Sequence, residues 1–255
     1  MHIWDNEQVL STGLLPPGCT KLIYPAMSRD RLALCAVDLR DDETAVIGSL
    51  VETLTYPPKR LFGAPAGVGL HFPRFAPSGQ ALAVIETQQG RDLDPRKEHK
   101  GELVVYTHND GTWIKRDTKI PCLVAPFDWG PNDGSLIHQD PERRLVLTRL
   151  DDPDYPAEIA REAKLPVTSP SGEAAAYYHR HQVMYAHPEE GIRTLNVDRA
   201  VMSLSWGLDE EELLIALATR FFETEVRVWN IRTNEMNPIF KTVSIDYAAL
   251  MAVPD

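Results

Sequence analysis

The residues Pro73-Arg74-Phe75-Ala76-Pro77-Ser78-Gly79-Gln80-Ala81-Leu82-Ala83-Val84 form a phrase that recurs along the chain. Each copy has an extended stretch, a tight polar turn and a second, apolar stretch, which is the pattern of a β-hairpin. Further copies lie at residues 127–137, 166–177 and 204–215, and a more divergent copy lies at residues 24–34. The phrase therefore predicts the architecture of the chain, although it indicates no chemistry.

The spacing of the copies predicts a repeat of four strands. Aligned on the apolar residue after the turn, the copies follow one another at steps of 50, 54, 39 and 38 residues. The aligned residues are Leu32, Leu82, Leu136, Ala175 and Leu213. Repeats of about 40 to 50 residues are typical of β-propeller blades, and unequal hairpin tips account for the unequal steps.

The fourth copy shows the expected blade most plainly. It predicts strands at residues 165–169, 174–179, 183–187 and 191–197, separated by short polar turns. In the second copy, the corresponding tip grows into a charged loop at residues 88–101, which has no apolar face to bury.

The third and fifth copies are less uniform. Residues 156–164 have a helical composition, and their place in the third copy predicts a fourth strand or a single helical turn. In the fifth copy, residues 213–219 and 226–231 predict strands on either side of a hairpin tip.

Two of the turns resemble a known repeat signature. Phe75-Ala76-Pro77-Ser78-Gly79 and Thr168-Ser169-Pro170-Ser171-Gly172 are similar to the W/F-S-P-D/N-G signature of TolB-like propeller repeats, also called PD40 or WD40-like repeats. The resemblance covers nearly all of the chain and implies a β-propeller whose channel is lined by the first strand of each repeat. True WD40 repeats match less well, because no Gly-His dipeptide opens a blade and Trp-Asp occurs only at Trp4-Asp5.

The two ends of the chain predict a sixth blade. Residues 3–12 are similar to the outer strands of the fifth copy, and residues 244–255 to a first strand that stops at its turn. Joined in space, these ends would close a six-bladed propeller and remove its open edges. The alternative is a five-bladed propeller with strand-like tails. We expect residues 1–255 to form a single β-propeller domain.

The expected closing blade is one strand short of four. A three-stranded blade, or a chain that continues beyond residue 255, explains the shortfall without a partner. The alternative hypothesis is that a partner protein supplies the missing strand by β-augmentation. Tyr247, in the C-terminal segment of this blade, is a candidate partner-binding residue.

Composition favours a folded, cytoplasmic protein. Apolar residues make up 43% of the chain and charged residues 25%, enough for a large core. The segment Met1–Glu7 carries acids where a secretory signal would be basic, and the apolar stretches are too short to cross a bilayer. The net charge of −11 argues against nucleic acid as a partner. Cys19, Cys35 and Cys122 are odd in number and widely spaced, which argues against a disulfide framework or a zinc site.

The sequence contains no recognised catalytic motif. It has no Gly-x-Ser-x-Gly elbow, no glycine-rich phosphate loop and no His-Glu-x-x-His. We therefore expect no catalytic, cofactor-binding or metal-binding residues. The alternatives are a small-ligand sensor and a metal-dependent propeller hydrolase or lactonase with carboxylates at the channel mouth, by analogy with other propellers. Carboxylates that recur at the hairpin tips, and that we expect to be solvated, are Asp38, Asp41, Asp42, Glu43, Asp140, Glu142, Glu223 and Glu225.

Histidines at two hairpin tips are the best metal candidates. His179 and His181, with His187 beyond them, could share a face of an extended strand, but no carboxylate is near them in the sequence. We interpret this tip as solvated, and give the equivalent tip, His138-Gln139-Asp140, the same interpretation. Arg180 and His181 are candidate contacts for a protein partner.

The hairpin tip Arg220-Phe221-Phe222 is the strongest candidate for partner binding. Two adjacent aromatic side chains on a strand point to opposite faces, so they cannot share one core. Exposed aromatics beside arginine are typical of protein-binding patches, and the alternative is that both pack between neighbouring blades. Arg96, in the charged loop, completes the candidates. The expected function is a non-catalytic protein–protein interaction scaffold that binds another protein, and neither nucleic acid nor a membrane.

Overall fold

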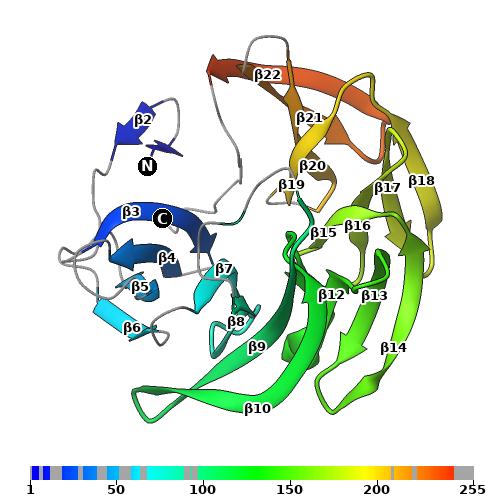
Figure 1. Cartoon of the computed structure of the whole chain (residues 1–255). Helices are drawn as coiled ribbons and strands as arrows, with labels where there is room; N and C mark the ends of the chain where they lie inside the picture. Colours follow the sequence, from blue (N-terminus) through cyan, green and yellow to red (C-terminus); the bar gives the residue numbers. More distant parts are fainter. Residues whose placement is uncertain are drawn as a thin grey trace. The chain divides into compact units, whose positions relative to one another are not determined.

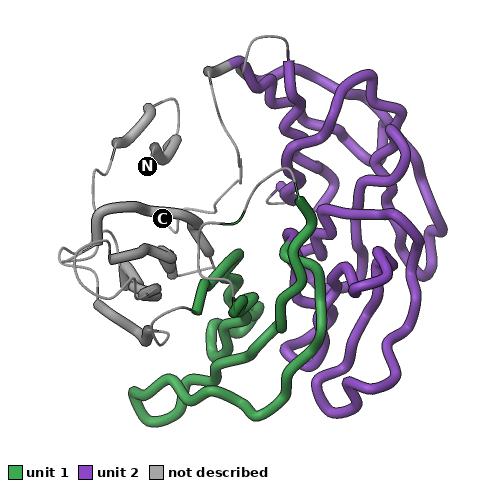
Figure 2. Tube along the Cα trace, viewed as in Figure 1, with its two compact units in different colours: residues 1–124, 253–255 green, residues 125–252 purple. Residues whose placement is uncertain are grey.

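The computed structural model describes part of the chain with its side chains, namely residues 68–88, 93, 97–207, 210–219, 223–239 and 241. In strands β1–β6, and at positions 240, 242 and 243, it describes the backbone alone. The chain forms two compact units, residues 1–124 with 253–255 and residues 125–252, and each is described by itself (Figure 2).

Unit 1 consists of antiparallel sheets whose strands follow one another in chain order (Figure 1). The first sheet pairs β1 (His2–Asp5) with β2 (Gln8–Ser11). The second contains β3 (Cys19–Met27), β4 (Arg31–Asp38), β5 (Ala45–Val51) and β6 (Lys59–Gly63). The third contains β7 (Gly69–Phe75), β8 (Ala81–Thr87), β9 (Lys100–Asn109) and β10 (Thr112–Leu123).

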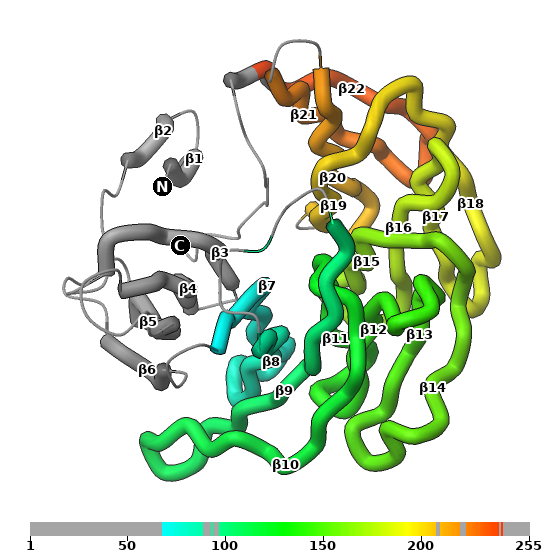
Figure 3. Tube along the Cα trace, in the orientation of Figure 1, coloured from blue at the N-terminus to red at the C-terminus, as the bar shows by residue number. Residues whose placement is uncertain are grey.

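Unit 2 consists of three antiparallel sheets of four strands each. The first contains β11 (Asp128–Trp129), β12 (Ser135–Gln139), β13 (Arg144–Arg149) and β14 (Asp152–Arg161), with a 3-10 turn at Asn132–Gly134. The second contains β15 (Lys164–Thr168), β16 (Ala175–His179), β17 (Gln182–His187) and β18 (Gly191–Asn196). The third contains β19 (Val201–Trp206), β20 (Glu212–Ala218), β21 (Glu223–Asn230) and β22 (Glu235–Val243). The first strands of successive sheets lie next to one another, and β14, β18 and β22 are the outer strands (Figure 3).

The repeated phrase forms the same turn in four sheets. In each, the residue that follows the first strand donates its amide to the carbonyl of the residue five positions later, at 2.7–2.9 Å. These bonds are Ala76–Ala81, Gly130–Ser135, Ser169–Ala174 and Gly207–Glu212. Gly79 and Gly172 have positive φ angles of 70° and 81° in these turns, which glycine adopts without a steric penalty.

The strand register confirms the alignment made from the sequence for four of the five copies, whereas Leu32 in the most divergent copy pairs with Met27, only five positions earlier. The aligned apolar residue pairs with the residue seven positions earlier in every one of the four turns. The pairs are Phe75–Leu82, Trp129–Leu136, Thr168–Ala175 and Trp206–Leu213. Three of the four aligned residues, Leu82, Leu136 and Leu213, are fully buried, so the phrase also fixes the core.

The sheets β15–β18 and β19–β22 share an apolar core. Trp206 and Trp229 are buried in it together with Tyr185, and each such side chain contributes roughly 2–3 kcal/mol by leaving water. Hydrogen bonds that span one repeat length tie the two sheets together. They are Trp206 Nε1 to the Val167 carbonyl (3.2 Å), Arg193 Nη1 to the Ile231 carbonyl (2.7 Å) and Ser171 Oγ to Glu210 Oε2 (2.8 Å).

The fold class is therefore confirmed as an all-β propeller built from four-stranded sheets. The four strands expected in the fourth copy are present within one residue at each end. The helical turn considered at residues 156–164 was wrong, and the strand alternative is confirmed by β14. Pro153 and Pro156 deprive this segment of helical hydrogen bonds, and β13 offers it a pairing edge. The C-terminal half of the expected closing blade, residues 244–255, lies outside the described residues.

Candidate binding site at one end of the sheet β19–β22

Each four-stranded sheet has two different ends. In an antiparallel sheet, the hairpin between the second and third strands and the linker into the first strand lie at one end, which we call the tip end. The repeated turn lies at the other. In the sheet β19–β22, the tip end carries the linker of residues 197–200, and the carbonyl of Ala200 accepts the amide of Ala218 at 2.9 Å. This bond holds the linker against the end of β20.

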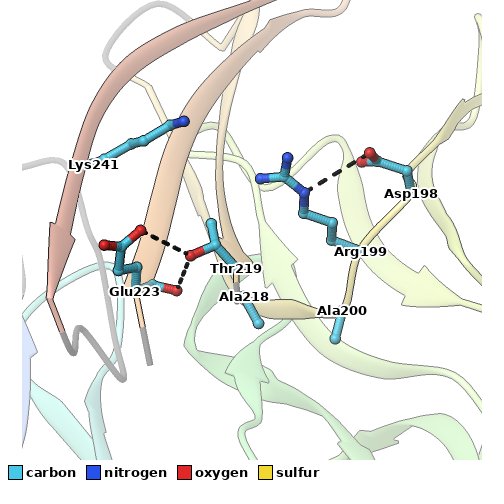
Figure 4. Close-up of a pocket in the computed structure, with 7 residues that line it drawn as sticks. All are labelled: Asp198, Arg199, Ala200, Ala218, Thr219, Glu223 and Lys241. Atoms are coloured by element: carbon cyan, nitrogen blue, oxygen red, sulfur yellow. Dashed lines mark hydrogen bonds and ion pairs between the residues drawn. The ribbon is translucent and has the colours of Figure 1, made fainter. Parts of the chain in front are cut away.

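A pocket of about 710 Å³ opens at this tip end (Figure 4). Residues from the linker, from the β20–β21 hairpin and from the outer strand β22 line it. They are Asp198, Arg199, Ala200, Ala218, Thr219, Glu223 and Lys241. Because so many side chains are charged, the pocket is suited to polar groups rather than to an apolar ligand.

Beside this pocket lies Glu225, a carboxylate whose side chain is only 5% exposed. It stands in β21 opposite Lys241 in the strand register, on the face that also carries Arg227 and Trp229. Since Trp229 belongs to the core shared with β15–β18, Glu225 lies where that core meets the tip end.

Three cations surround the Glu225 carboxylate. Arg227 Nε donates to Oε1 at 2.8 Å and Arg199 Nη1 donates to Oε2 at 2.6 Å, while Lys241 Nζ is 3.7 Å from Oε2. The hydrogen bonds from Arg227 and then Arg199 outweigh the opposing effect of burial and lower the pKa of Glu225 to about 2. Glu225 is therefore ionised at neutral pH, and it anchors the linker residue Arg199 to the sheet.

Two further carboxylates, those of Glu223 and Asp198, line the pocket itself. The Thr219 hydroxyl donates to the backbone carbonyl of Glu223 at 2.9 Å and lies 3.5 Å from its carboxylate. Asp198 Oδ2 is 3.8 Å from Arg199 Nε. In Figure 4, the charged ends of Lys241 and Arg199 point toward the space between them, with Glu223 and Asp198 to either side.

The candidate residues Arg180 and His181 lie at the tip end of the neighbouring sheet, β15–β18. Both have positive φ angles, 46° and 66°, as the two central residues of a tight hairpin turn. The Arg180 side chain is 73% exposed and its Nη2 lies 3.5 Å from Glu162 Oε2, so a carboxylate does stand near this tip. His181 is exposed, as expected of a solvated tip, whereas His179 and His187 are partly buried.

The other candidate partner-binding residues, Arg220, Phe221, Phe222, Arg96 and Tyr247, lie outside the described residues. Their predicted roles stay predictions. The two residues that flank the tip Arg220-Phe221-Phe222 in the chain, Thr219 and Glu223, both line the pocket.

The solvated interpretation of His138 and Asp140 was wrong. His138 is 2% exposed, its Nε2 lies 2.8 Å from the Thr148 hydroxyl, and burial lowers its pKa, so the ring is neutral. Asp140 is 5% exposed and accepts hydrogen bonds from the Arg144 amide (2.8 Å), the Glu142 amide (3.0 Å) and Arg144 Nε (2.6 Å). Burial acts to raise the pKa of Asp140, but the bonds from Arg144 prevail and lower it.

The same correction applies to Glu225, which was grouped with solvated tip carboxylates but lies two positions inside β21. The sequence did contain a signal for this. In Glu223-Thr224-Glu225-Val226-Arg227, charges occupy every second position and so share one strand face with Trp229. Arg199 and Lys241, the two other cations of the site, were not identified from the sequence. Within the described ranges, no group of three His, Cys, Asp or Glu side chains is placed to hold a metal ion.

No family model and no curated protein sequence matches the chain. Its fold is similar to TolB from Acinetobacter baumannii, with a TM-score of 0.65 at 11% identity over 88% of this chain. It is also similar to an oligogalacturonate lyase in complex with manganese (TM-score 0.57, 17% identity, 80% of this chain) and to a chain of the mitotic checkpoint complex (0.56, 11%, 92%). The chain spans 55% of the TolB chain, 61% of the lyase chain and 83% of the checkpoint chain.

These identities show the fold alone, and that fold is a TolB-like β-propeller, as the turn signature implied. In the parts of the chain that the structure describes, no helix is long and apolar enough to span a membrane.

Proposed function

We propose that the protein is a non-catalytic interaction platform that binds another protein at the tip end of its sheets. The observation that carries the proposal is the pocket at the tip end of β19–β22, because both residues that flank Arg220-Phe221-Phe222 line it. The chain segment between these two lining residues contains two aromatic residues and an arginine, which are the residue types enriched at protein-binding surfaces.

The contacts between the two sheets β15–β18 and β19–β22 support this function. The core and the hydrogen bonds between β15–β18 and β19–β22 fix the two sheets against each other, so binding costs little ordering entropy. The similarity to a chain of the mitotic checkpoint complex, which is named as a protein assembly, favours the same function.

We further propose that the platform is a single six-bladed domain. The pair β1–β2 would contribute two strands to a closing blade and residues 244–255 a third, with a strand from the partner protein as the alternative completion. Hydrogen exchange of the β1–β2 amides in full-length protein, with and without a captured partner, distinguishes these alternatives.

The platform is tested by affinity capture with matched variants. We expect the wild-type protein to retain a defined partner from an extract of its source organism, and Phe222→Asp to lose it. Arg232→Gln is the control, since Arg232 is exposed in the β21–β22 turn at the opposite end of the same sheet. Equal capture by all three proteins, with unchanged melting temperatures, would contradict the proposed surface.

A metal-dependent propeller enzyme is the second candidate, favoured by the similarity to the manganese-bound lyase. Metal analysis of the purified full-length protein separates the two functions. One bound divalent ion per chain, together with turnover of a lactone or a uronate oligosaccharide, would replace the platform by the enzyme.

A further inference from the structure

The two cations that face the pocket at the tip end of β19–β22 have hydrogen-bond donors to spare. Lys241 is 63% exposed, and its 3.7 Å contact with Glu225 is too long for a hydrogen bond. Its ammonium group donates no hydrogen bond to any residue that the structure describes. Arg199 uses Nη1 on Glu225 and turns Nε toward Asp198. Its Nη2 group has no acceptor within the described part of the chain.

The Glu225 carboxylate is already neutralised without Lys241. The guanidinium groups of Arg227 and Arg199 both donate to it, so a single negative charge has two positive charges in direct contact. Lys241 then adds a third positive charge on the side of the pocket. The cluster of Arg199, Arg227 and Lys241 therefore carries more positive charge than Glu225 alone neutralises, and two of its members, Arg199 and Lys241, line the pocket.

The carboxylates of the pocket limit which anions this excess attracts. Glu223 and Asp198 bring two negative charges to the same pocket, so the charged side chains that the structure describes at the site sum to no net charge. A multiply charged anion would be repelled by these carboxylates and by the chain's net charge of −11. A group with one negative charge, held between Arg199 and Lys241, fits the arrangement.

We propose that this pocket binds a single carboxylate of a partner protein, which Lys241 and Arg199 hold by charge-assisted hydrogen bonds. The inference rests on the proposed function, since it names the chemistry of the partner segment. A volume of about 710 Å³ is far larger than one carboxylate needs, so it accommodates the residue that carries the group and its neighbours. The carboxylate belongs to an internal Asp or Glu, or to the C-terminus of the partner chain.

A peptide selection tests the inference without knowledge of the partner. A phage-displayed library of random decapeptides is selected on the full-length protein, and in parallel on Lys241→Gln. We expect acidic residues to be enriched among the peptides selected on the wild-type protein, and not among those selected on Lys241→Gln. When the carboxylate of the best synthetic peptide is replaced by an amide, its affinity for the wild-type protein should fall about tenfold or more. The unmodified peptide should bind Lys241→Gln more weakly than the wild-type protein by a similar factor. Free and amidated C-termini on otherwise identical peptides identify which source of carboxylate the pocket prefers.

Two further variants make the test decisive. Arg199→Lys keeps the positive charge but loses the guanidinium geometry, so we expect it to bind the peptide more weakly than the wild-type protein does. It should still bind more strongly than the double variant Lys241→Gln/Arg199→Gln. Arg232→Gln is the matched control and should bind as wild type does. Selection of no peptide, selection of peptides without acidic residues, or equal affinity for Lys241→Gln would each overturn the inference.

This test fails separately from the proposed function. If Phe222→Asp loses the captured partner while Lys241→Gln retains it, the platform stands and the carboxylate inference is wrong. If metal analysis and turnover reveal an enzyme, the platform is wrong, and the peptide selection still decides what the pocket binds.

Discussion

Two buried carboxylates, Asp140 and Glu225, lie at the tip ends of two sheets in the same unit, yet they are held in different ways. The partners of Asp140 all lie within four positions of it in the chain, at Glu142 and Arg144. The partners of Glu225 come from the linker at Arg199, from its own strand at Arg227 and from the next strand at Lys241.

The difference teaches what each carboxylate does. Asp140 organises a tight hairpin, in which Arg143 has a φ of 64° and its amide donates to the Asp140 carbonyl at 3.0 Å. The hydrogen bonds that the Asp140 carboxylate accepts all come from residues of that turn. Glu225 instead joins three separate segments, and the cations that gather around it exceed what one charge requires. A local cluster shapes a turn, whereas a cluster assembled from distant segments can also present donors to a ligand.

The largest expected effect is on folding stability when Glu225 is removed. Glu225→Ala leaves two guanidinium groups, Arg199 and Arg227, without their buried counter-charge, and we expect a loss of about 3 kcal/mol in the free energy of unfolding. Urea denaturation measures it. Glu223→Ala, two positions earlier and exposed, is the control and should cost no more than about 0.5 kcal/mol. Equal losses for the two variants would show that Glu225 is not a buried ion pair in solution.

The second effect is the acid dependence of stability. The folded-state pKa of Glu225 is about 2, below its ordinary 4.5, so its contribution is complete above pH 4.5 and is lost as the pH falls from 4.5 toward 2. Between pH 5.5 and pH 3, the wild-type protein should lose about 2 kcal/mol more than Glu225→Gln does. Parallel denaturation curves for the two proteins over this range would contradict the ion cluster.

A smaller loss is expected when Asp140 becomes asparagine. The amide oxygen can still accept the backbone bonds from Glu142 and Arg144, so only the charge on the Arg144 pair is lost. We expect Asp140→Asn to cost about 1 to 2 kcal/mol in urea denaturation. A loss as large as that of Glu225→Ala would contradict the distinction drawn between the cluster around Asp140 and the cluster around Glu225.

The smallest effect on stability is expected for Lys241→Gln. Because Lys241 is 63% exposed and stands 3.7 Å from a carboxylate that two arginines already neutralise, its removal should change the free energy of unfolding by less than about 0.5 kcal/mol. The same variant should bind selected peptides poorly. A large drop in melting temperature would assign Lys241 to the frame of the sheet and not to the ligand site.

The frame was predictable from the sequence because it is built from local, repeated interactions. The turn bond and the strand register recur at the same offsets from Leu82, Leu136 and Leu213, so one repeated pattern predicts the turn in each of these sheets. The segment at residues 156–164 was ambiguous because its composition suits a helix, and only the edge of β13 decides that it is a strand.

The site was far less predictable, because its geometry depends on residues distant in the sequence. Nothing near Glu225 indicates that Arg199, 26 positions earlier, reaches its carboxylate. The burial of His138 likewise depends on Thr148 in the following strand. Charge alternation along Glu223-Thr224-Glu225-Val226-Arg227 was the one local signal of the ion cluster.

The hydrogen bonds between the sheets β15–β18 and β19–β22 connect positions 38 or 39 residues apart, as from Trp206 to Val167 and from Arg193 to Ile231. Because of this spacing, the insertion or deletion of one whole repeat disturbs the fold least. A duplication or deletion of 39 codons between equivalent positions would keep the length of the repeat, and donors such as Trp206 and Arg193, which use backbone carbonyls, would meet a carbonyl at the equivalent position. Insertions of other lengths are compatible with the frame only at the tip ends, where no repeat-length bond has to be preserved.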